Sequence, residues 1–538
     1  MTGSDAMAKC LEAEGVEVVY GYPGVAITHF FDSLGDTDIR QVLVRTEQNA
    51  GHMASGYART LGKVGVCVVT SGPGALNLLT GIATAYADSI PLVCISGQVD
   101  SDLIGSDGFQ EADVTGAAES FVKYSYLVKN VKDIPRVFRE AFHIANTGRR
   151  GPVLIDVPID VQKAELKEFE YPEEVSLRTY KPTVKGHIQQ IKKAMSELKK
   201  AKRPLVCAGG GVFLSGAKKE LRAFVEEHNI PVVHTMMGIG VLPTDHELNF
   251  GMVGNNGGIA ANKAMQECDM LIMVGARVAD RAVANPDTIL DNKVLVHIDV
   301  DPAEIGKNVG PTIPIVGDAK HIFEDIREIE LSVNTSEWLS HLKEYRKLPS
   351  PLKFSDKAVN PAVFIGLLSQ EMPDNSIYVA DVGQNQIWSC RNVNVREGGR
   401  FYTSGGMGTM GYSFPAAIGA KMADESRMVV TVSGDGGFQM SMMELATMKE
   451  EKVDVKIVVL RNNYLGLVRE YQHYSLNDRY EMVKLGGYPK LDELAKAYDI
   501  NYYRAENMEG IDELIRSFLD NEGTALMEVI LDPMDTVK

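Results

Sequence analysis

Two apolar stretches in the last third of the chain set the pattern for the whole sequence: residues 429–438 (VVTVSGDGGF) and residues 456–463 (KIVVLRNN). Each apolar run ends in small polar residues, which predicts a buried parallel strand that opens into a loop. Residues 443–448 between them predict a helix. Because the right-handed crossover of a strand–helix–strand unit brings both strand ends to one edge of the sheet, we expect Asp435 and Asn462 to face each other there.

The chemistry of this pair of residues indicates a cation site. A carboxylate, a side-chain amide and loop carbonyls, with no His or Cys, form a set of hard oxygen ligands suited to Mg²⁺ that holds a diphosphate. The alternative is an ordinary crossover in which Gly434-Asp435-Gly436 forms a turn and Asn462 caps a helix. The paired spacing of Asp435 and Asn462 favours the metal site.

The same succession of strands and helices recurs in three blocks of similar size, residues 1–166, 186–335 and 357–538. This alternation predicts an α/β fold in which three parallel sheets are covered by helices on both faces. Polar segments that contain prolines, residues 167–185 and 336–356, separate the blocks, although the first dozen residues of the second segment could be helical. A chain of 538 residues is too long for one hydrophobic core, which agrees with this division.

The composition excludes several classes of protein. A formal net charge of −17 argues against generic binding to nucleic acid or to an anionic membrane, because both need a basic surface. The sequence has no apolar run of transmembrane length and no signal-like or Arg-rich start, so we expect a cytoplasmic protein. The 6 cysteines are scattered without a CxxC spacing, which predicts buried, reduced thiols and neither a zinc site nor a disulfide framework.

Two further features are ambiguous when they are considered alone. Glu47 follows a predicted strand and precedes a predicted helix, so it is either a surface carboxylate favoured by the helix dipole or a functional acid. In the middle block, residues 208–211 (AGGG) follow a strand, which is a weak indication of a dinucleotide site. Arg277 and Arg281 suit a pyrophosphate, and carboxylates after strands suit ribose or flavin hydroxyls. The alternative is a degenerate domain that has lost its nucleotide.

Longer motifs resolve part of this ambiguity. They are residues 45–59 (RTEQNAGHMASGYAR), 70–75 (TSGPGA), 109–113 (FQEAD), 275–281 (GARVADR), 404–411 (SGGMGTMG) and 434–436 (GDG) with Asn462. Together they resemble the thiamine-diphosphate-dependent enzymes over nearly the whole chain, and among these the resemblance is closest to the catalytic subunits of acetolactate synthases. The resemblance implies two thiamine-diphosphate-binding domains with a Rossmann-like, FAD-binding domain between them.

The resemblance also implies a reaction. Pyruvate would be decarboxylated on thiamine diphosphate, which acts as the electron sink, and the hydroxyethyl carbanion would condense with a second 2-keto acid in branched-chain amino acid biosynthesis. Glu47 would hydrogen-bond the aminopyrimidine ring of the cofactor, where a carboxylate strengthens the bond as positive charge develops. Met410 would be an apolar wedge that bends the cofactor. Gly408 would contact the pyrimidine through its backbone.

The other site residues are assigned by the same resemblance. On the substrate side it implies Phe109, Gln110 and Lys123, although Lys123 could equally be a solvated lysine. For thiamine diphosphate it implies Tyr22, Pro23, Gly24, Gly74, Asn77, Gln384, Asn385, Gly408, Met410, Gly434, Asp435, Gly436, Gly437, Asn462, Gly466 and Leu467. For FAD it implies Gly209, Gly210, Gly211, Thr235, Gly254, Gly275, Arg277, Arg281, Asp299 and Asp318. For Mg²⁺ it implies Asp435, Asn462 and the backbone carbonyl of Tyr464.

Several departures from the family pattern leave the substrates open. They are Val25, Thr46, Asn49, Asn385 and Tyr471, at positions where the family usually has Gly, His, Gly, His and Trp. A related decarboxylase, another carboligase or a flavin-dependent pyruvate oxidase therefore remains an alternative to acetolactate synthesis. A non-catalytic nucleotide-binding or regulatory subunit is a further alternative. The presence of Glu47, Asp435 and Asn462 together argues against it, because a site without catalytic activity does not require all three. The family also implies a homodimer or homotetramer with active sites between subunits, and a small regulatory subunit.

Overall fold

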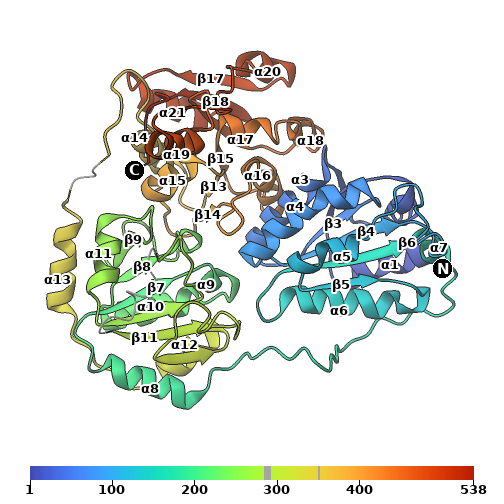
Figure 1. The fold of residues 1–538 in the computed structure, drawn as a ribbon, viewed down its shortest axis with the longest axis horizontal. Coiled ribbons are helices and arrows are strands. Elements are labelled where there is room, and N and C mark those ends of the chain that lie inside the picture. The colour runs from blue at the N-terminus through green and yellow to red at the C-terminus, as the bar shows by residue number, and fades with distance from the viewer. Residues whose placement is uncertain (284–292, 349–351, 538) are drawn as a thin grey trace.

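The computed structural model describes residues 1–283, 293–348 and 352–537, and it consists of three α/β domains (Figure 1). Short 3₁₀ helices carry the label η. The first domain contains α1 (Gly3–Ala13), β1 (Val18–Tyr22), η1 (Val25–Ile27), α2 (Thr28–Leu34), β2 (Arg40–Leu43), α3 (Glu47–Leu61), β3 (Gly65–Val69), α4 (Pro73–Asp88), β4 (Leu92–Gln98), α5 (Val114–Ala118), η2 (Glu119–Phe121), β5 (Tyr124–Leu127), η3 (Val131–Asp133), α6 (Ile134–Asn146), β6 (Pro152–Pro158) and α7 (Ile159–Lys163).

The remaining elements form the middle and last domains. The middle domain contains α8 (Ile188–Leu198), β7 (Pro204–Ala208), α9 (Gly211–Leu214), α10 (Lys218–His228), β8 (Val232–His234), η4 (Met236–Gly238), β9 (Asn249–Met252), α11 (Ile259–Glu267), β10 (Met270–Val274), β11 (Val294–Asp299), β12 (Ile313–Val316), α12 (Ala319–Arg327) and α13 (Ser336–Tyr345). The last domain contains α14 (Pro361–Glu371), β13 (Ile377–Ala380), α15 (Gln384–Asn392), β14 (Arg400–Tyr402), α16 (Ser413–Ala423), β15 (Val429–Gly434), α17 (Asp435–Gln439), α18 (Glu444–Glu450), β16 (Lys456–Arg461), α19 (Gly466–Leu476), α20 (Leu491–Ala497), β17 (Asn501–Ala505), α21 (Ile511–Leu519) and β18 (Ala525–Ile530).

Each domain is built on a parallel sheet of 6 strands, which confirms the predicted fold class. The first sheet has the order β2-β1-β3-β4-β6-β5 and the third has the order β14-β13-β15-β16-β18-β17. If the strands are numbered within each domain, these two orders are identical. The middle sheet, β12-β11-β10-β7-β8-β9, instead has the strand order of the dinucleotide-binding fold. The topology therefore distinguishes the middle domain from the other two.

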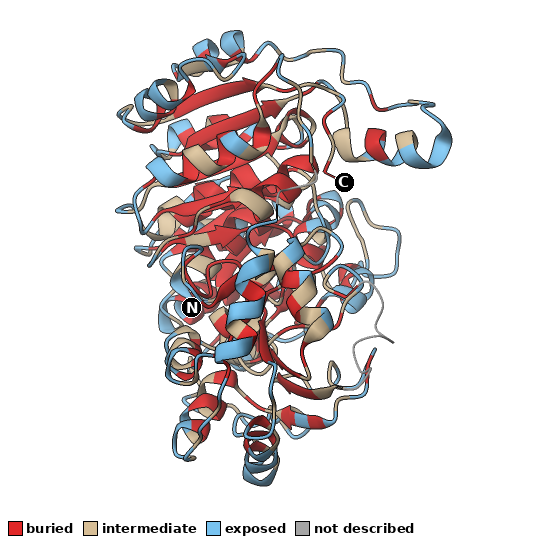
Figure 2. Cartoon of the chain, turned by 90° about the vertical axis from the view of Figure 1, so that its left-hand side faces the viewer, coloured by how far each residue is buried: buried red, intermediate tan, exposed pale blue. Residues whose placement is uncertain are grey.

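The central strands are buried because helices cover both faces of each sheet, whereas edge strands such as β2, β5 and β17 are partly exposed. Figure 2 shows the strands largely in the buried colour. The apolar runs that predicted them, such as residues 429–434, lie in these cores. The predicted helix at residues 443–448 is α18, and the second polar segment begins with the helix α13. All 6 cysteines are buried and free. Within the described part of the chain, no helix is both long enough and apolar enough to cross a membrane.

The first and last domains are joined by two closely packed helices, α3 and α16, which lie side by side in Figure 1. Glycines permit this close approach. A Cβ at Gly56 would lie 1.9 Å from the carbonyl oxygen of Ala416, and a Cβ at Gly419 would lie 1.9 Å from that of Met53. The buried ion pair between Arg59 and Asp88, at 2.8 Å, lies at the far end of the same contact. The two domains therefore share one continuous core.

Candidate functional site

The carboxyl edge of the first sheet carries Glu47. The strand β2 leads to Thr46, and α3 begins at Glu47, where the helix dipole favours a carboxylate. Asn77 on α4 donates a hydrogen bond from Nδ2 to Glu47 Oε2 at 3.1 Å. Gly74 approaches the other oxygen, because a Cβ there would lie 3.1 Å from Glu47 Oε1. The structure therefore brings Glu47, Gly74 and Asn77 together.

The loop that follows β4 adds two predicted residues to this edge. The backbone of Gln110 packs against Gly72, where a Cβ would lie only 2.6 Å from the Gln110 carbonyl oxygen. Gly72 has a φ of +56° and Gln110 a φ of +60°, so the backbone of both residues is in the left-handed region. The Phe109 side chain is 90% exposed. An exposed aromatic ring in a loop that packs on the N-terminus of α4 is suited to contact a ligand or another protein surface.

The predicted contacts from β1 lie at the end of that strand. Tyr22 is its last residue and is partly exposed. Gly24 faces Thr70 at the end of β3, and a Cβ at Gly24 would lie 2.5 Å from Thr70 Oγ1. Pro23 lies between Tyr22 and Gly24 in the chain. Because β1 and β3 are adjacent parallel strands, these residues belong to the same carboxyl edge as Glu47.

The carboxyl edge of the third sheet carries Asp435 and Asn462, the two predicted side-chain ligands of Mg²⁺, which form the metal pair. The adjacent strands β15 and β16 end at Gly434 and Arg461, so Asp435 and Asn462 follow at the same edge. The backbone N–H of Asn463 donates to Asp435 Oδ2 at 2.7 Å, and the N–H of Tyr464 donates to Asn462 Oδ1 at 3.0 Å. Burial raises the pKa of Asp435 to about 6. A buried carboxylate with a raised pKa is stabilised in its charged form by a bound cation.

Gln384 and Asn385 begin α15 at the same edge. Gln384 Oε1 accepts from Asn462 Nδ2 at 3.1 Å, and its Nε2 donates to Glu470 Oε2 and to the Asp535 carbonyl oxygen, both at 2.9 Å. Asn385 Nδ2 donates to the carbonyl oxygens of Asp381 and Val432. These hydrogen bonds within the chain fix the side-chain amides of Gln384 and Asn385. A Cβ at Gly466 would lie 2.0 Å from Gln384 Oε1, so the start of α19 also packs closely here.

The glycine-rich loop of residues 404–411 is held by a buried acid. Asp381 accepts hydrogen bonds from the backbone N–H groups of Gly411 at 3.0 Å and Ser413 at 2.9 Å. A Cβ at Gly437 would lie 2.6 Å from Asp381 Oδ1. Met410 approaches the loop of the metal pair, because a Cβ at Gly436 would lie 3.5 Å from Met410 Cε. The structure therefore brings Met410, Gly436 and Gly437 together.

Within one chain, Glu47 and the glycine-rich loop lie at opposite ends of α3. Arg59, near the end of that helix, donates to the Thr403 carbonyl oxygen at 2.9 Å, and Gly406 N–H donates to Asp88 at 2.7 Å. Glu47 and Arg59 are 12 positions apart in the sequence, which corresponds to roughly 18 Å along a helix axis. A single chain therefore presents two separate groups of site residues.

A cavity of about 1010 Å³ lies where the three domains meet. Most of the residues predicted for FAD line it: Gly210, Gly211, Thr235, Gly275, Arg277, Arg281, Asp299 and Asp318. Gly209 packs instead on Gly275 and Ala276, and Gly254 packs on the Arg281 carbonyl. Leu467 and Gly408 line the cavity from the last domain. Burial raises the pKa of Asp299 to about 6.

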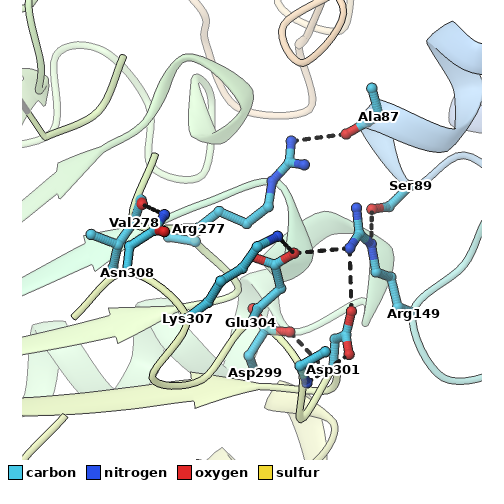
Figure 3. A network of polar contacts seen from close by, with 12 residues as sticks. Ala87, Ser89, Arg149, Arg277, Val278, Asp299, Asp301, Glu304, Lys307 and Asn308 are labelled. Carbon is cyan, nitrogen blue, oxygen red and sulfur yellow. Dashed lines mark hydrogen bonds and ion pairs between the residues drawn. The ribbon is translucent and has the colours of Figure 1, made fainter. Parts of the chain in front are cut away.

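Figure 3 shows how the first and middle domains meet beside this cavity. Arg149 donates from Nη1 to Glu304 Oε1 at 3.0 Å and to Asp301 Oδ2 at 3.2 Å, and Arg277 Nη2 donates to the Ala87 carbonyl oxygen at 2.8 Å. The sequence reasoning missed Arg149 and Glu304, as well as Asp381. The sequence signal that could have identified Arg149 is its position beside Arg150, just before β6.

Lys123 lies apart from the residues with which it was predicted to act. It is just before β5, at the amino edge of the first sheet, where its N–H donates to the Pro152 carbonyl oxygen. Its ammonium group donates to the carbonyl oxygen of Thr147 at 2.7 Å and to Tyr180 Oη at 2.8 Å. Glu47 lies at the opposite, carboxyl edge. Within one chain Lys123 is therefore not brought together with Glu47, and its contact with substrate stays a prediction. Sequence order alone does not show which edge of a sheet a residue occupies.

Comparison with known proteins agrees with this division of the chain. Residues 1–117 match the N-terminal TPP binding domain of thiamine pyrophosphate enzymes, residues 191–326 match their central domain, and residues 381–529 match their C-terminal TPP binding domain. This chain belongs to the thiamine pyrophosphate enzyme family. The match to both outer domains accounts for their shared strand order.

Curated relatives narrow the assignment within the family. A probable acetolactate synthase large subunit of Methanocaldococcus jannaschii is 44% identical over 100% of this chain and 93% of its own length. The acetolactate synthase large subunit of Lactococcus lactis is 39% identical over 100% of this chain and 93% of its own, and that of Corynebacterium glutamicum is 43% identical over 90% and 79%. This thiamine pyrophosphate enzyme is therefore of the acetolactate synthase type.

Proposed function

We propose that this enzyme decarboxylates pyruvate and joins the resulting two-carbon unit to a second 2-keto acid, as an acetolactate synthase. The observation that carries the proposal is the placement of Glu47 at the start of α3, with its carboxylate oriented by Asn77 at the carboxyl edge of the thiamine-binding first sheet. The names of the curated relatives support the same reaction.

The donor set of the last domain fits Mg²⁺ and a diphosphate. Asp435 and Asn462 offer side-chain oxygens, Tyr464 offers a backbone carbonyl, and the buried Asp435 has a raised pKa that a cation would lower. Thiamine diphosphate, when bound, supplies the electron sink for the carbanion that decarboxylation leaves.

In this reaction Glu47 would hold and move a proton at its carboxylate, as the hydrogen-bond partner of the aminopyrimidine ring. Asn77 keeps the carboxylate in one orientation through the 3.1 Å hydrogen bond. Gly74 leaves the carboxylate unobstructed, because a Cβ there would lie 3.1 Å from Glu47 Oε1. Phe109 and Val25, which are 90% and 80% exposed, would form apolar walls around the reacting 2-keto acid.

The active site would be completed by a second copy of this chain. Within one chain Glu47 begins α3, whereas the glycine-rich loop, whose Met410 approaches Gly436, lies at the other end of that helix. Both outer domains expose apolar side chains: Tyr22, Val25, Leu76 and Phe109 in the first, and Met440, Val468 and Tyr471 in the last. Apolar exposure of this kind marks a protein contact. We therefore propose a homodimer as the smallest active form, with a small subunit as a further partner, as the relatives' name "large subunit" implies.

The central cavity fits FAD. Its glycines allow close backbone approach, since a Cβ at Gly211 would lie 2.6 Å from Gly275 Cα, and Asp299 follows a strand at the place where a carboxylate binds a ribose. Arg277 and Arg281 offer positive charge for a pyrophosphate. The strand order of the middle sheet is that of dinucleotide-binding folds, which supports the same proposal. Retention of flavin absorbance after gel filtration would test it.

The decisive experiment is an assay of the wild type and Glu47→Gln with pyruvate, thiamine diphosphate, Mg²⁺ and FAD. Acetolactate, acetaldehyde and oxygen uptake are measured together, so that carboligation, plain decarboxylation and oxidation are distinguished. We expect acetolactate from the wild type and a loss of about 100-fold to 10,000-fold in Glu47→Gln. The exposed Glu12 on α1 provides the control, because Glu12→Gln should leave turnover unchanged. Unchanged turnover in Glu47→Gln would refute the proposal.

A further inference from the structure

A buried ion pair lies behind the loop that carries the metal pair. Arg461, the last residue of β16, donates from Nη1 to Glu528 Oε1 on the neighbouring strand β18. Val459 pairs with Glu528 in the β16–β18 register, so Arg461, two residues further on, projects from the same face of the sheet. The two side chains are only 12% and 2% exposed.

The guanidinium group of Arg461 contacts three different parts of the chain. Besides Glu528, its Nε donates to Asn463 Oδ1 at 2.9 Å and its Nη2 donates to the Gly487 carbonyl oxygen. A planar guanidinium can make these contacts simultaneously, whereas the compact ammonium group of lysine cannot. Arg461 therefore fixes the loop after β16 and the loop at Gly487 relative to the sheet.

Asn463 transmits this constraint to the metal pair. Its φ is +58°, a left-handed conformation that Asn adopts more readily than most residues but that still needs support from its surroundings. In this conformation its N–H donates to Asp435 Oδ2 at 2.7 Å, and its carbonyl oxygen accepts from Leu485 N–H at 3.0 Å. The side chain of the same residue is held by Arg461.

Glu528 is held in turn by the edge strand β17. Arg504 lies opposite Glu528 in the register and donates from Nη1 to Glu528 Oε2 at 3.1 Å, and Tyr502 Oη donates to the same oxygen. The Arg504 side chain is 47% exposed, and its polar contacts within the described residues go to Tyr502, Glu506 and Glu528, not to the loop after β16. Arg504 thus shares the carboxylate without reaching the metal pair.

We propose that Arg461 and Glu528 are positioning residues that set the affinity of the Asp435–Asn462 site for Mg²⁺. They hold the loop of Asn462 and Asn463 in the one conformation that presents its oxygens beside Asp435. The inference rests on the proposed function, since it concerns the metal site of that reaction. Residues that orient metal ligands typically change metal affinity by about 10-fold to 100-fold when they are replaced.

The test measures Mg²⁺ half-saturation for thiamine diphosphate binding to the full chain, by isothermal titration calorimetry at a fixed cofactor concentration. We expect Arg461→Gln and Glu528→Gln to raise the half-saturating Mg²⁺ concentration about tenfold or more. Arg504→Gln removes an equal charge from the same carboxylate, and we expect it to stay within about twofold because exposed ion pairs contribute little. The thermal midpoint of each Mg²⁺-free variant reports separately on folding.

The outcomes separate the two proposals. Glu528→Gln leaves two arginines without their shared carboxylate and could unfold, so Arg461→Lys, which keeps the charge but not the planar group, serves as a second variant with an intermediate expected effect. A folded Arg461→Gln protein with unchanged Mg²⁺ half-saturation overturns the inference alone. If the wild type binds thiamine diphosphate equally well without Mg²⁺, or if Asp435→Asn leaves the Mg²⁺ requirement unchanged, the metal site itself is refuted and the inference falls with it.

Discussion

The first and last domains have the same strand order but place different chemistry at the same edge of the sheet. In the first domain, the second strand leads to Glu47, a partly exposed acid whose carboxylate accepts a hydrogen bond from Asn77. In the last domain, the third and fourth strands lead to Asp435 and Asn462, which are buried in a network of hydrogen bonds. The comparison teaches that the scaffold fixes where site residues gather, while the surrounding side chains decide whether that place is open to proton transfer or rigid enough to hold a cation.

The strongest way to sharpen this contrast is to remove one carboxylate charge from each edge. Asp435→Asn should abolish Mg²⁺-dependent binding of thiamine diphosphate, with a loss beyond the roughly 100-fold seen when only a supporting residue is removed. Glu47→Gln should bind Mg²⁺ and cofactor normally and lose turnover instead. Calorimetric binding and steady-state turnover measured on both variants check the expectation. Equal loss of binding in the two variants would contradict the division of roles.

A smaller effect is expected where the two domains touch. In Gly419→Ala the new Cβ would lie 1.9 Å from the Met53 backbone carbonyl, which cannot move without displacing α3. Overpacking of this kind lowers the free energy of unfolding by about 1–3 kcal/mol. Gly366 provides a matched control in α14, since the nearest atom to a Cβ there is 3.9 Å away. Gly366→Ala should stabilise the helix by roughly 0.5–1 kcal/mol.

Denaturant unfolding of the two alanine variants measures both values. If Gly419→Ala is as stable as the wild type, the α3–α16 contact is looser than the structure indicates. A stable Gly419→Ala protein with lower turnover would instead show that the contact sets the relative position of the two domains without contributing to folding.

A pH-dependent effect is expected from a buried acid of the first domain. Burial raises the pKa of Asp156 to about 7, although Ser96 and Gln98 donate hydrogen bonds to it. A folded-state pKa above the unfolded value of about 3.9 means that the folded state binds the proton more tightly, so this group lowers stability as pH rises from about 4 to about 7. The slope is at most about 1.4 kcal/mol per pH unit.

Asp156→Asn should remove that contribution. The free energy of unfolding, measured in urea at a series of pH values from about 4 to about 7, should fall less steeply with pH in the variant than in the wild type. Gln98 Nε2 also donates to the Ala112 carbonyl oxygen at 2.8 Å, so the loop that carries Gln110 should keep its position in the variant. An identical pH dependence in both proteins would show that folding does not raise the pKa of Asp156.

The sequence was sufficient for features that depend on local patterns. Apolar runs that end in small polar residues predicted the parallel strands, and the crossover rule alone placed Asp435 and Asn462 at one edge of the sheet. The carboxyl edge of the first sheet was likewise predictable from the strand that precedes Glu47. In each case the deciding signal lies within a few residues of the site, or follows from a handedness that nearly all such units obey.

Only the tertiary structure decided which distant side chains support these sites. Glu528 meets Arg461 because of the register between β16 and β18, and Asp381 reaches Gly411 because of the fold of the glycine-rich loop. The position of Lys123 could not be predicted for the corresponding reason, since nothing near it in the sequence shows which edge of the sheet it occupies. Hydrophobic periodicity is a local property of the chain, whereas the partner of a buried charge is set by strand register and helix packing between residues far apart in sequence.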